Sequence, residues 1–256
     1  MTPLSREIRK GVDRVAFAEA LGIIPDEWQA EALRSDAPRQ IYNTSRQSGK
    51  SSTAAILAVH TVLFQPASLV LLLSPTLRQS GEIFRKCLDV YRDAGRPVAP
   101  VSETALTLTL ANSSRLVSLP GQEGTVRGYS SVRLLVIDEA SRVSDALYAS
   151  VRPMLAVSQG RLCALSTPWG MRGWWYEAWR SSAEEWERFE VKATEIPRIS
   201  AEFLAEERVA LPARIFRQEY LCSFEATEDQ VFSLEDVDRA ITHNVKPLFS
   251  EAEGAA

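Results

Sequence analysis

Short and long hydrophobic segments alternate along this chain. The short, continuous segments 67–74 (ASLVLLLS), 132–138 (VRLLVID) and 160–166 (GRLCALS) are typical of strands that are buried on both faces of a parallel sheet. Longer segments with helical spacing lie between them, including an apolar, proline-free stretch over 52–63 and another over 77–91. This alternation predicts a three-layer α/β domain with a mainly parallel central sheet.

The remaining segments predict smaller elements around this core. In chain order we expect helices over 5–21 and 26–33, an antiparallel pair of strands over 105–111 and 115–119, a helix over 144–155 kinked at Pro153, a packed tryptophan-rich helix over 169–179, a strand over 186–194, and helices over 200–210 and 213–220. We assign residues 1–180 to the core with its N-terminal helices, and residues 181–256 to a small acidic lid or linker subdomain.

One turn-rich loop carries the clearest chemical signal. The stretch 41–53, IYNTSRQSGKSST, predicts a strand, a loop and the first turn of a helix. In such a loop the backbone N–H groups converge on a phosphate, Lys50 reaches the β- and γ-phosphates of a nucleotide, and Ser51 is a ligand of Mg²⁺. The stretch departs from the strict G-x-x-x-x-G-K-[ST] pattern, because Thr44 stands where the first glycine is expected. Taken alone, it is also compatible with a surface turn.

Two of the predicted strands end in polar residues that suit nucleotide chemistry. One ends at Asp138 and continues into Glu139, and a later one ends in Ser166-Thr167. The carboxyl ends of parallel strands meet at one edge of a sheet, where open α/β sheets bind ligands. At that edge Asp138 would hold Mg²⁺ and its waters, while Glu139 would polarise the attacking water. The hydroxyl groups of Ser166 and Thr167 would sense the γ-phosphate.

Composition limits the class of protein. With 256 residues, 45% of them hydrophobic, the chain can build a large core. No apolar run approaches the roughly 18 residues of a membrane span, and the N-terminus lacks the apolar centre of a signal peptide, so we expect a cytoplasmic protein. The three cysteines, Cys87, Cys163 and Cys222, lie far apart without metal-ligand spacing, which supports neither a zinc site nor a disulfide framework.

The net charge of −4 hides an asymmetry between the two parts of the chain. Residues 1–180 hold 21 Lys and Arg against 16 Asp and Glu, whereas residues 181–256 hold 8 against 17. Most of the cations are arginines, whose planar guanidinium suits phosphate binding, although a compositional bias of the source genome would give the same count. The acidic total predicts weak DNA binding with a steep salt dependence.

Taken together, these motifs resemble the ATPase half of a large terminase, the motor that packages double-stranded DNA into the capsids of tailed bacteriophages. The similarity extends over most of the chain. Residues 45–51 (SRQSGKS) match the family's variant phosphate loop, which commonly lacks the first glycine. Residues 134–141 (LLVIDEAS) resemble its metal-binding strand, 165–168 (LSTP) resemble its coupling motif, and 217–220 (RQEY) resemble a stretch near the end of its ATPase region.

The resemblance implies a P-loop NTPase fold of the ASCE, RecA-like type, with a small C-terminal subdomain, and it gives roles to individual residues. Glu139 would be the catalytic carboxylate. Arg46, in the loop of the same subunit, and Arg127, reaching the nucleotide of a neighbouring subunit, compete as the arginine that neutralises transition-state charge. Ser51 and Asp138 would hold Mg²⁺, and Ser166 and Thr167 would couple hydrolysis to motion. ATP would bind at Trp28, Gln29, Ser45, Gln47, Ser48, Gly49, Lys50, Ser51 and Ser52. Of these, Trp28 would stack on the adenine, and the amide of Gln29 would recognise its edge.

The resemblance also implies partners and a place of action. These are double-stranded DNA, the portal protein of the procapsid, the small terminase subunit, and further copies of the chain in a pentameric ring when assembled, with a monomer expected in isolation. The motor would act in the host cytoplasm at the procapsid portal, without a membrane. Large terminases normally continue into a nuclease domain with an acidic two-metal cluster. We see no counterpart of that domain in this sequence and expect no DNA cleavage by this chain.

Two other functions fit parts of the sequence. A helicase-like, nucleic-acid-dependent ATPase would need a second motor domain, and the residues after Arg180 leave little room for one. A nucleotide-binding assembly module that does not hydrolyse ATP would have no need of a water-polarising carboxylate, so the presence of Glu139 beside Asp138 argues against it.

Overall fold

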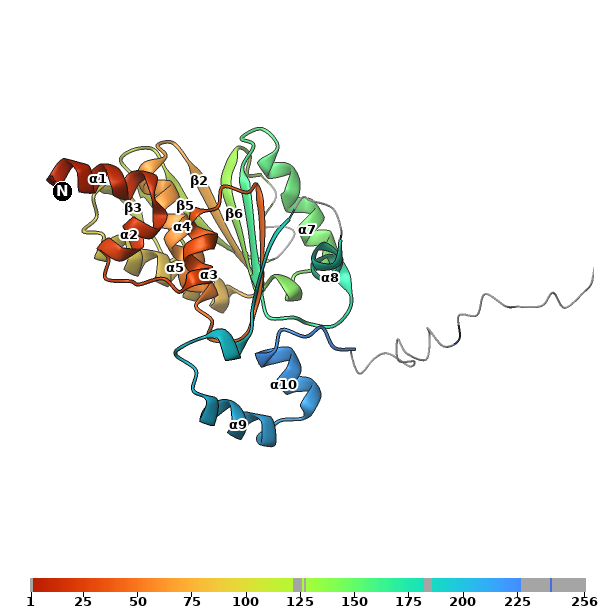
Figure 1. Cartoon of the computed structure of the whole chain (residues 1–256). Coiled ribbons are helices and arrows are strands. Elements are labelled where there is room, and N and C mark those ends of the chain that lie inside the picture. Colours follow the sequence, from red (N-terminus) through yellow and green to blue (C-terminus); the bar gives the residue numbers. More distant parts are fainter. Residues whose placement is uncertain (1, 122–125, 127, 182–185, 227–239, 241–256) are drawn as a thin grey trace, which may run out of the picture. The chain divides into compact units, whose positions relative to one another are not determined.

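An eight-stranded sheet lies at the centre of the protein (Figure 1). The computed structural model describes residues 2–121, 126, 128–181, 186–226 and 240, and the sheet lies within them. Its order is β3-β4-β5-β2-β6-β7-β1-β8, with parallel pairing from β5 to β8 and antiparallel pairing of β3 with β4 and of β4 with β5. The strands are β1 (Arg39–Thr44), β2 (Leu69–Ser74), β3 (Pro100–Glu103), β4 (Thr107–Leu110), β5 (Arg115–Pro120), β6 (Val132–Asp138), β7 (Arg161–Ser166) and β8 (Glu187–Val191).

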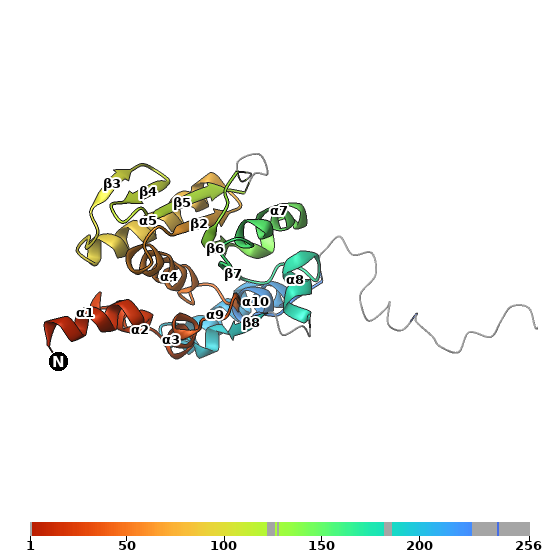
Figure 2. The ribbon, with the colours of Figure 1, turned by 90° about the horizontal axis from the view of Figure 1, so that it is seen from above.

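Helices cover both faces of this sheet, and α4 and α7 lie on opposite sides of it (Figure 2). The α-helices are α1 (Pro3–Val12), α2 (Arg14–Ala20), α3 (Glu27–Arg34), α4 (Lys50–Phe64), α5 (Leu77–Asp93), α7 (Asp145–Val151), α8 (Gly173–Arg180), α9 (Ala201–Ala210) and α10 (Ala213–Tyr220). Short 3-10 turns are η1 (Ala140–Arg142), η2 (Arg152–Leu155) and η3 (Ala193–Glu195). Within the described ranges, no helix combines the length and apolar character needed to cross a bilayer.

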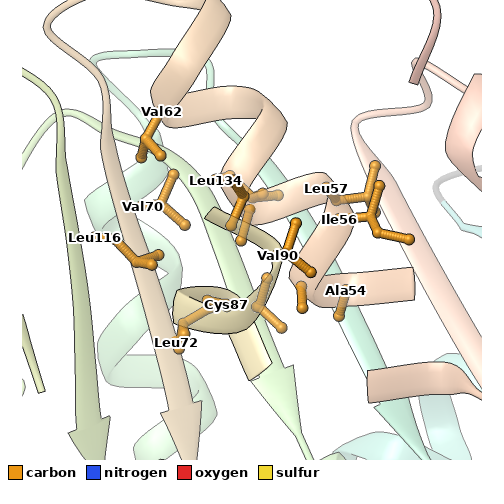
Figure 3. Close-up of a cluster of buried hydrophobic side chains, with 14 of the residues drawn as sticks. Ala54, Ile56, Leu57, Val62, Val70, Leu72, Cys87, Val90, Leu116 and Leu134 are labelled. Atoms are coloured by element: carbon orange, nitrogen blue, oxygen red, sulfur yellow. The ribbon is translucent and has the colours of Figure 1, made fainter. Parts of the chain in front are cut away.

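The continuous apolar strands arise because both faces of the sheet are covered. Successive side chains of a strand point to opposite faces, so Val70 and Leu72 of β2 pack with α4 and α5. Part of this cluster is drawn in Figure 3. Leu71 and Leu73 instead join the cluster that includes residues of α7 and α8. The predicted three-layer α/β architecture, with its mainly parallel sheet and its antiparallel strands at one edge, is confirmed.

The N-terminal segment differs from the prediction. A single helix was expected over 5–21, but the chain forms α1 and α2 with a break at Asp13. Asp13 has extended backbone angles (φ −124°, ψ 109°), and its carboxylate accepts a hydrogen bond from the backbone N–H of Val15 (2.9 Å). Such a cap satisfies a donor that the first turn of a helix leaves open. The aspartate therefore starts a new helix at a point where hydrophobic spacing alone predicts continuity.

The packed helix expected over 169–179 is present but begins later, at Gly173, and Trp169 lies before it and is 37% exposed. Trp175 is buried, and the indole of Trp174 stacks on Tyr148 with ring centroids 3.8 Å apart. The indole N–H of Trp174 also donates to the backbone carbonyl of Val143 (2.9 Å). These contacts pack α8 against α7 on the face of the sheet that carries Leu71 and Leu73. The kink expected at Pro153 is confirmed too, because α7 gives way there to the 3-10 turn η2.

Gly160, the residue before β7, allows a test of how closely the chain packs there against β6 and η2. A Cβ atom on Gly160 would lie 1.9 Å from the backbone oxygen of Val132 and 2.9 Å from Cδ2 of Leu155. We expect Gly160→Ala to lower the free energy of unfolding by about 1–3 kcal/mol or more, as overpacking does, when measured by urea denaturation. Gly81→Ala is the matched control, because a Cβ there meets nothing within 4 Å and alanine favours the helix α5. A Gly160→Ala protein as stable as the control would contradict the packing described here.

Candidate functional site

Three neighbouring strands bring the predicted site residues to one edge of the sheet. The strands β6, β7 and β1 are adjacent and parallel. Asn43 pairs with Ser166, and Asp138 pairs with Leu165, so all three strands end at the same level. The chain leaves β1 for α4, on one face, and leaves β6 for η1 and α7, on the other face. Such a divergence opens a crevice at the carboxyl edge, where α/β sheets bind ligands.

The loop between β1 and α4 presents unused backbone donors. Within the described part of the chain, no hydrogen bond engages the backbone N–H groups of residues 47–51. Those of Ser45 and Arg46, by contrast, donate to carbonyl groups of β8 and α10 (2.9 and 3.1 Å). Gly49 has a left-handed backbone (φ 91°), and a Cβ there would lie 2.5 Å from Nε2 of Gln29. Successive amides of this kind, at the start of a helix, form an anion-binding concavity.

Thr44 has a structural role in place of the glycine that the strict loop pattern expects. Its hydroxyl shares a 2.8 Å hydrogen bond with the hydroxyl of Ser48, and both side chains are fully buried. This bond closes the base of the loop from one side to the other. The departure from the pattern is therefore compatible with an ordered loop.

Two buried charges lie at this edge, one at the start of α4 and one at the end of β6, which β7 separates from β1. Lys50, the first residue of α4, is 8% exposed, and Asp138, the last residue of β6, is 7% exposed. Among the described residues neither makes an ion pair, and Oδ1 of Asp138 has no hydrogen-bond partner. Burial, followed by the charge of Glu139, raises the pKa of Asp138 to about 6, while Lys50 acts in the opposite direction. Such uncompensated polar groups are candidates for ligand binding.

Glu139 is held in a strained conformation beside the end of β7. Its backbone lies in the left-handed region (φ 50°, ψ 45°), which is uncommon for a residue with a side chain. Its Oε2 lies 3.5 Å from the hydroxyl of Ser166, which in turn bonds the hydroxyl of Ser141 at 2.7 Å. The predicted catalytic carboxylate and the predicted coupling residue are therefore neighbours. Thr167, the second predicted coupling residue, is buried next to Ser166.

The structure places Gln29 against the loop with its amide already engaged. Its Oε1 accepts from the backbone N–H of Asp26 (2.9 Å), and its Nε2 donates to the hydroxyl of Thr53 (3.0 Å) and to the carbonyl of Gly49 (3.4 Å). The indole of Trp28 packs edge-on against Tyr42, with ring centroids 5.8 Å apart. These contacts fix α3 to the loop, and adenine recognition by the two residues stays a prediction.

The remaining predicted residues lie around the loop. Arg46 forms an ion pair with Glu219 of α10, which, opposed by partial burial, raises the pKa of the guanidinium. The hydroxyl of Ser45 is buried without a hydrogen-bond partner among the described residues. In the first turn of α4, Ser51 is half-buried and Ser52 is exposed. Arg127 lies outside the described residues.

Two residues at this edge were not predicted. The guanidinium of Arg198 donates to the carboxylate of Asp26 (2.7 Å) and to the backbone carbonyl of Ser48 (3.3 Å). No motif surrounds Arg198, so only the folded chain reveals that it touches the loop. Ser74 ends β2 beside β6, and its fully buried hydroxyl lacks a partner in the described part of the chain. Its position after a buried strand is a signal that could have identified it.

Comparisons with known proteins agree with this arrangement. The family described as terminase large subunit, T4likevirus-type, N-terminal, matches residues 41–239. The large terminase subunit of Thermus phage G20c is 28% identical over 254 residues, covering 85% of this chain and 52% of that protein. The chain thus spans about half the length of the curated relatives it matches.

Solved structures share the fold. The ATPase domain of the Thermus phage P74-26 large terminase superposes with a TM-score of 0.74 and 26% identity, covering 82% of this chain and 97% of that one. A large terminase from a thermophilic bacteriophage, solved in complex with ADP, has a TM-score of 0.60 and 12% identity, covering 81% of this chain and 52% of that one. The predicted P-loop fold of the ASCE type is therefore confirmed. The chain belongs to the terminase large subunit family and corresponds to its N-terminal ATPase domain.

Proposed function

We propose that this chain is the ATP-hydrolysing motor domain of a phage DNA-packaging machine, which drives double-stranded DNA into a procapsid. The observation that carries the proposal is the set of backbone amides at residues 47–51, which make no hydrogen bond to any described residue and lie at the same edge of the sheet as the buried charges of Lys50 and Asp138. Amides and an ammonium group together suit a polyphosphate, and an unpaired carboxylate suits a metal ion that accompanies it. The family relationship and the similar large terminase solved with ADP support ATP as the substrate.

The phosphate chain binds along the loop. The N–H groups of residues 47–51 donate to phosphate oxygens, and Lys50 neutralises the β- and γ-phosphates. Because Gln29 bonds Gly49 and Thr53, it keeps the loop in its left-handed conformation when the phosphates arrive. A site formed before binding loses less conformational entropy on binding.

Asp138, at the end of β6, and Ser51, in the first turn of α4, fit a magnesium ion. Oδ1 of Asp138 is buried and lacks a partner among the described residues, and the hydroxyl of Ser51 lies in the first turn of α4. Oxygen ligands of this kind are those that Mg²⁺ prefers. When bound, Mg²⁺ supplies charge neutralisation on the phosphate oxygens.

Glu139 acts as the carboxylate that orients and polarises the attacking water. Its strained backbone and the nearby hydroxyl of Ser166 hold it at the crevice, which favours one orientation of the carboxylate. Arg46 from the same chain or Arg127 from a neighbouring copy neutralises charge in the transition state. The two arginines remain alternatives.

The link from hydrolysis to movement runs through Ser166 and Thr167 and through the C-terminal helices. Ser166 lies at the carboxylate of Glu139, and Arg46 joins the loop to α10 through Glu219. A change at the γ-phosphate can therefore reach both β7 and α10. We propose that α9 and α10, which follow the sheet strand β8 in the segment after residue 180, act as the lid. The motor works in the host cytoplasm as a ring, pentameric on the portal, with the small terminase subunit as a further partner. The proposal does not include a nuclease activity.

Removal of the Glu139 carboxylate tests the proposed hydrolysis. We expect Glu139→Gln to lower the steady-state rate of ATP hydrolysis by about 10²- to 10⁴-fold, the usual contribution of a general base, while ATP still binds in calorimetry. Glu82→Gln, at an exposed position of α5, is the control and should leave the rate unchanged. A specific activity that rises with protein concentration would support a site completed between copies. Full activity of Glu139→Gln would refute the assigned role.

The raised pKa of Asp138 predicts that this residue lowers the free energy of unfolding of the ligand-free protein, and that the effect depends on pH. Between about pH 4 and pH 6 the native state keeps a proton that the unfolded chain has released. The contribution of Asp138 to the free energy of unfolding therefore falls as the pH rises through this window. We expect Asp138→Asn to stabilise the ligand-free protein by on the order of 1–3 kcal/mol at pH 7.5 and by much less at pH 4.

Urea denaturation at the two pH values measures this difference. Asp89→Asn, an exposed position of α5, is the control and should show the same small effect at both. If Asp138→Asn were only as stable as the wild type at pH 7.5, Asp138 would not be a desolvated carboxylate.

A further inference from the structure

The guanidinium of Arg142 lies over the indole of Trp169, and neither residue has a role in the chemistry described so far. The carbon Cζ of Arg142 is 3.4 Å from the centroid of the ring, well inside the roughly 6 Å within which a cation and an aromatic face attract each other. Within the described residues, no carboxylate forms an ion pair with Arg142. The stack on Trp169 is therefore the contact that orders this side chain.

Trp169 is unusually exposed for a residue of its size. It is 37% exposed, whereas Trp174 and Trp175, in the following helix α8, are 8% and 2% exposed. A tryptophan in the core is explained by the apolar area that it buries, and that explanation is weaker for Trp169. Pro168 is buried directly before it, and the fixed φ of proline limits the freedom of the backbone that carries the indole. A partly exposed ring on such a backbone, with a cation over its face, indicates a contact between two loops.

The stack joins the two turns that carry the predicted catalytic and coupling residues. Arg142 ends the turn η1, which begins directly after Glu139. Trp169 lies in the loop between β7 and α8. Because β6 and β7 are adjacent and parallel, these two turns leave the sheet side by side. The hydrogen bond between the hydroxyl groups of Ser141 and Ser166 (2.7 Å) links the same turns at the end of β7.

Glu139 depends on such links because its own conformation is strained. Its backbone is left-handed (φ 50°, ψ 45°), and its carboxylate lies 3.5 Å from the hydroxyl of Ser166, which is longer than a usual O–H···O hydrogen bond. Backbone hydrogen bonds within η1 run from Arg142 to the carbonyl of Glu139 (2.9 Å) and from Val143 to that of Ala140 (3.1 Å). A residue in a sparsely populated backbone region stays there only when its surroundings over-determine it. The stack supplies a constraint from a different strand, which bonds within the turn do not.

We propose that Arg142 and Trp169 are positioning residues, whose stack holds the turn after β6 so that the carboxylate of Glu139 meets the attacking water. The inference rests on the proposed function, because it assumes that Glu139 polarises this water. The loop proposed to bind the phosphates leaves β1, and β7 separates that strand from β6. Loss of the stack therefore affects the chemical step and not the binding of ATP.

A double-mutant cycle tests this inference. Trp169→Leu keeps an apolar side chain without an aromatic face, and Arg142→Met keeps an unbranched side chain without the charge. Steady-state ATP hydrolysis with Mg²⁺ gives kcat and KM, and calorimetry gives the Kd for ATP and the fraction of protein that binds it. We expect each single variant to lower kcat about 10-fold, less than the roughly 10²-fold that a displacement of 1 Å costs, with KM, Kd and the binding fraction unchanged. The double variant should also lose about 10-fold, because both substitutions remove one shared contact.

Two further variants serve as controls. Trp169→Phe keeps a flat aromatic face for the guanidinium and should restore most of kcat. Arg180→Met is the matched control, because Arg180 also lies over an aromatic ring, 5.2 Å from the centroid of Tyr176, but stands at the end of α8 and in neither turn. It should leave kcat unchanged. A purely structural role of the stack would instead lower the fraction of protein that binds ATP.

The outcomes separate the inference from the function beneath it. Wild-type kcat in Trp169→Leu and Arg142→Met would overturn the inference. A loss of about 100-fold in the double variant would also overturn it, because the two side chains would then act independently. A loss confined to KM would do the same, because it would place one of these side chains at the nucleotide. If Glu139→Gln hydrolysed ATP as fast as the wild type, the proposed role of Glu139 itself would fail, whatever the cycle showed.

Discussion

The burial of Lys50 and Asp138 at one edge of the sheet is the constraint on which the rest of the site depends. Each charge has lost most of its water, and neither has an ion-pair partner within the described residues. A buried charge without a partner is expensive, and the raised pKa of Asp138 reflects that cost. The arrangement is reasonable only if a ligand completes it. In the function that we propose, a polyphosphate with its metal ion would supply a negative partner for Lys50 and a positive one for Asp138.

The fold makes this arrangement possible because the apolar core stabilises the sheet, while the polar residues at its carboxyl edge are available for binding. Both faces of the sheet are covered by large apolar clusters, so the strands can hold their ends rigidly without help from the polar residues there. The polar residues can then be strained, as Glu139 is, or can lack a hydrogen-bond partner among the described residues, as the hydroxyl groups of Ser45 and Ser74 do. Hydroxyl pairs link one strand end or loop to the next, with Thr44 bonded to Ser48 and Ser141 to Ser166. The edge is consequently ordered by short polar contacts and stabilised by the core behind it.

Local patterns were sufficient to predict most of this framework. Buried parallel strands are short and continuously apolar, so β2, β6 and β7 could be predicted from the sequence, and with them the positions of Asp138 and Ser166. The break at Asp13 was missed because a helix cap overrides a hydrophobic period that runs through it. The contacts of Arg198 with Asp26 and Ser48 could not be predicted, because they join residues about 150 positions or more apart without a motif. The hydrogen bonds of Gln29 could not be predicted for a related reason. The sequence indicates that Gln29 lies near the loop, but not that its amide makes hydrogen bonds within the protein.

The most direct test of this account is the effect of ATP and Mg²⁺ on thermal unfolding, in the wild type and in Lys50→Met. A ligand that binds only the native state stabilises it by RT ln(1 + [L]/Kd), or about 2.7 kcal/mol at a hundredfold excess over Kd. We expect ATP with Mg²⁺ to raise the melting temperature of the wild type and of Lys86→Met, which removes an exposed lysine of α5, and to leave that of Lys50→Met unchanged. An equal rise in Lys50→Met, or no rise in the wild type, would contradict the claim that the buried charges at this edge are there to bind a nucleotide.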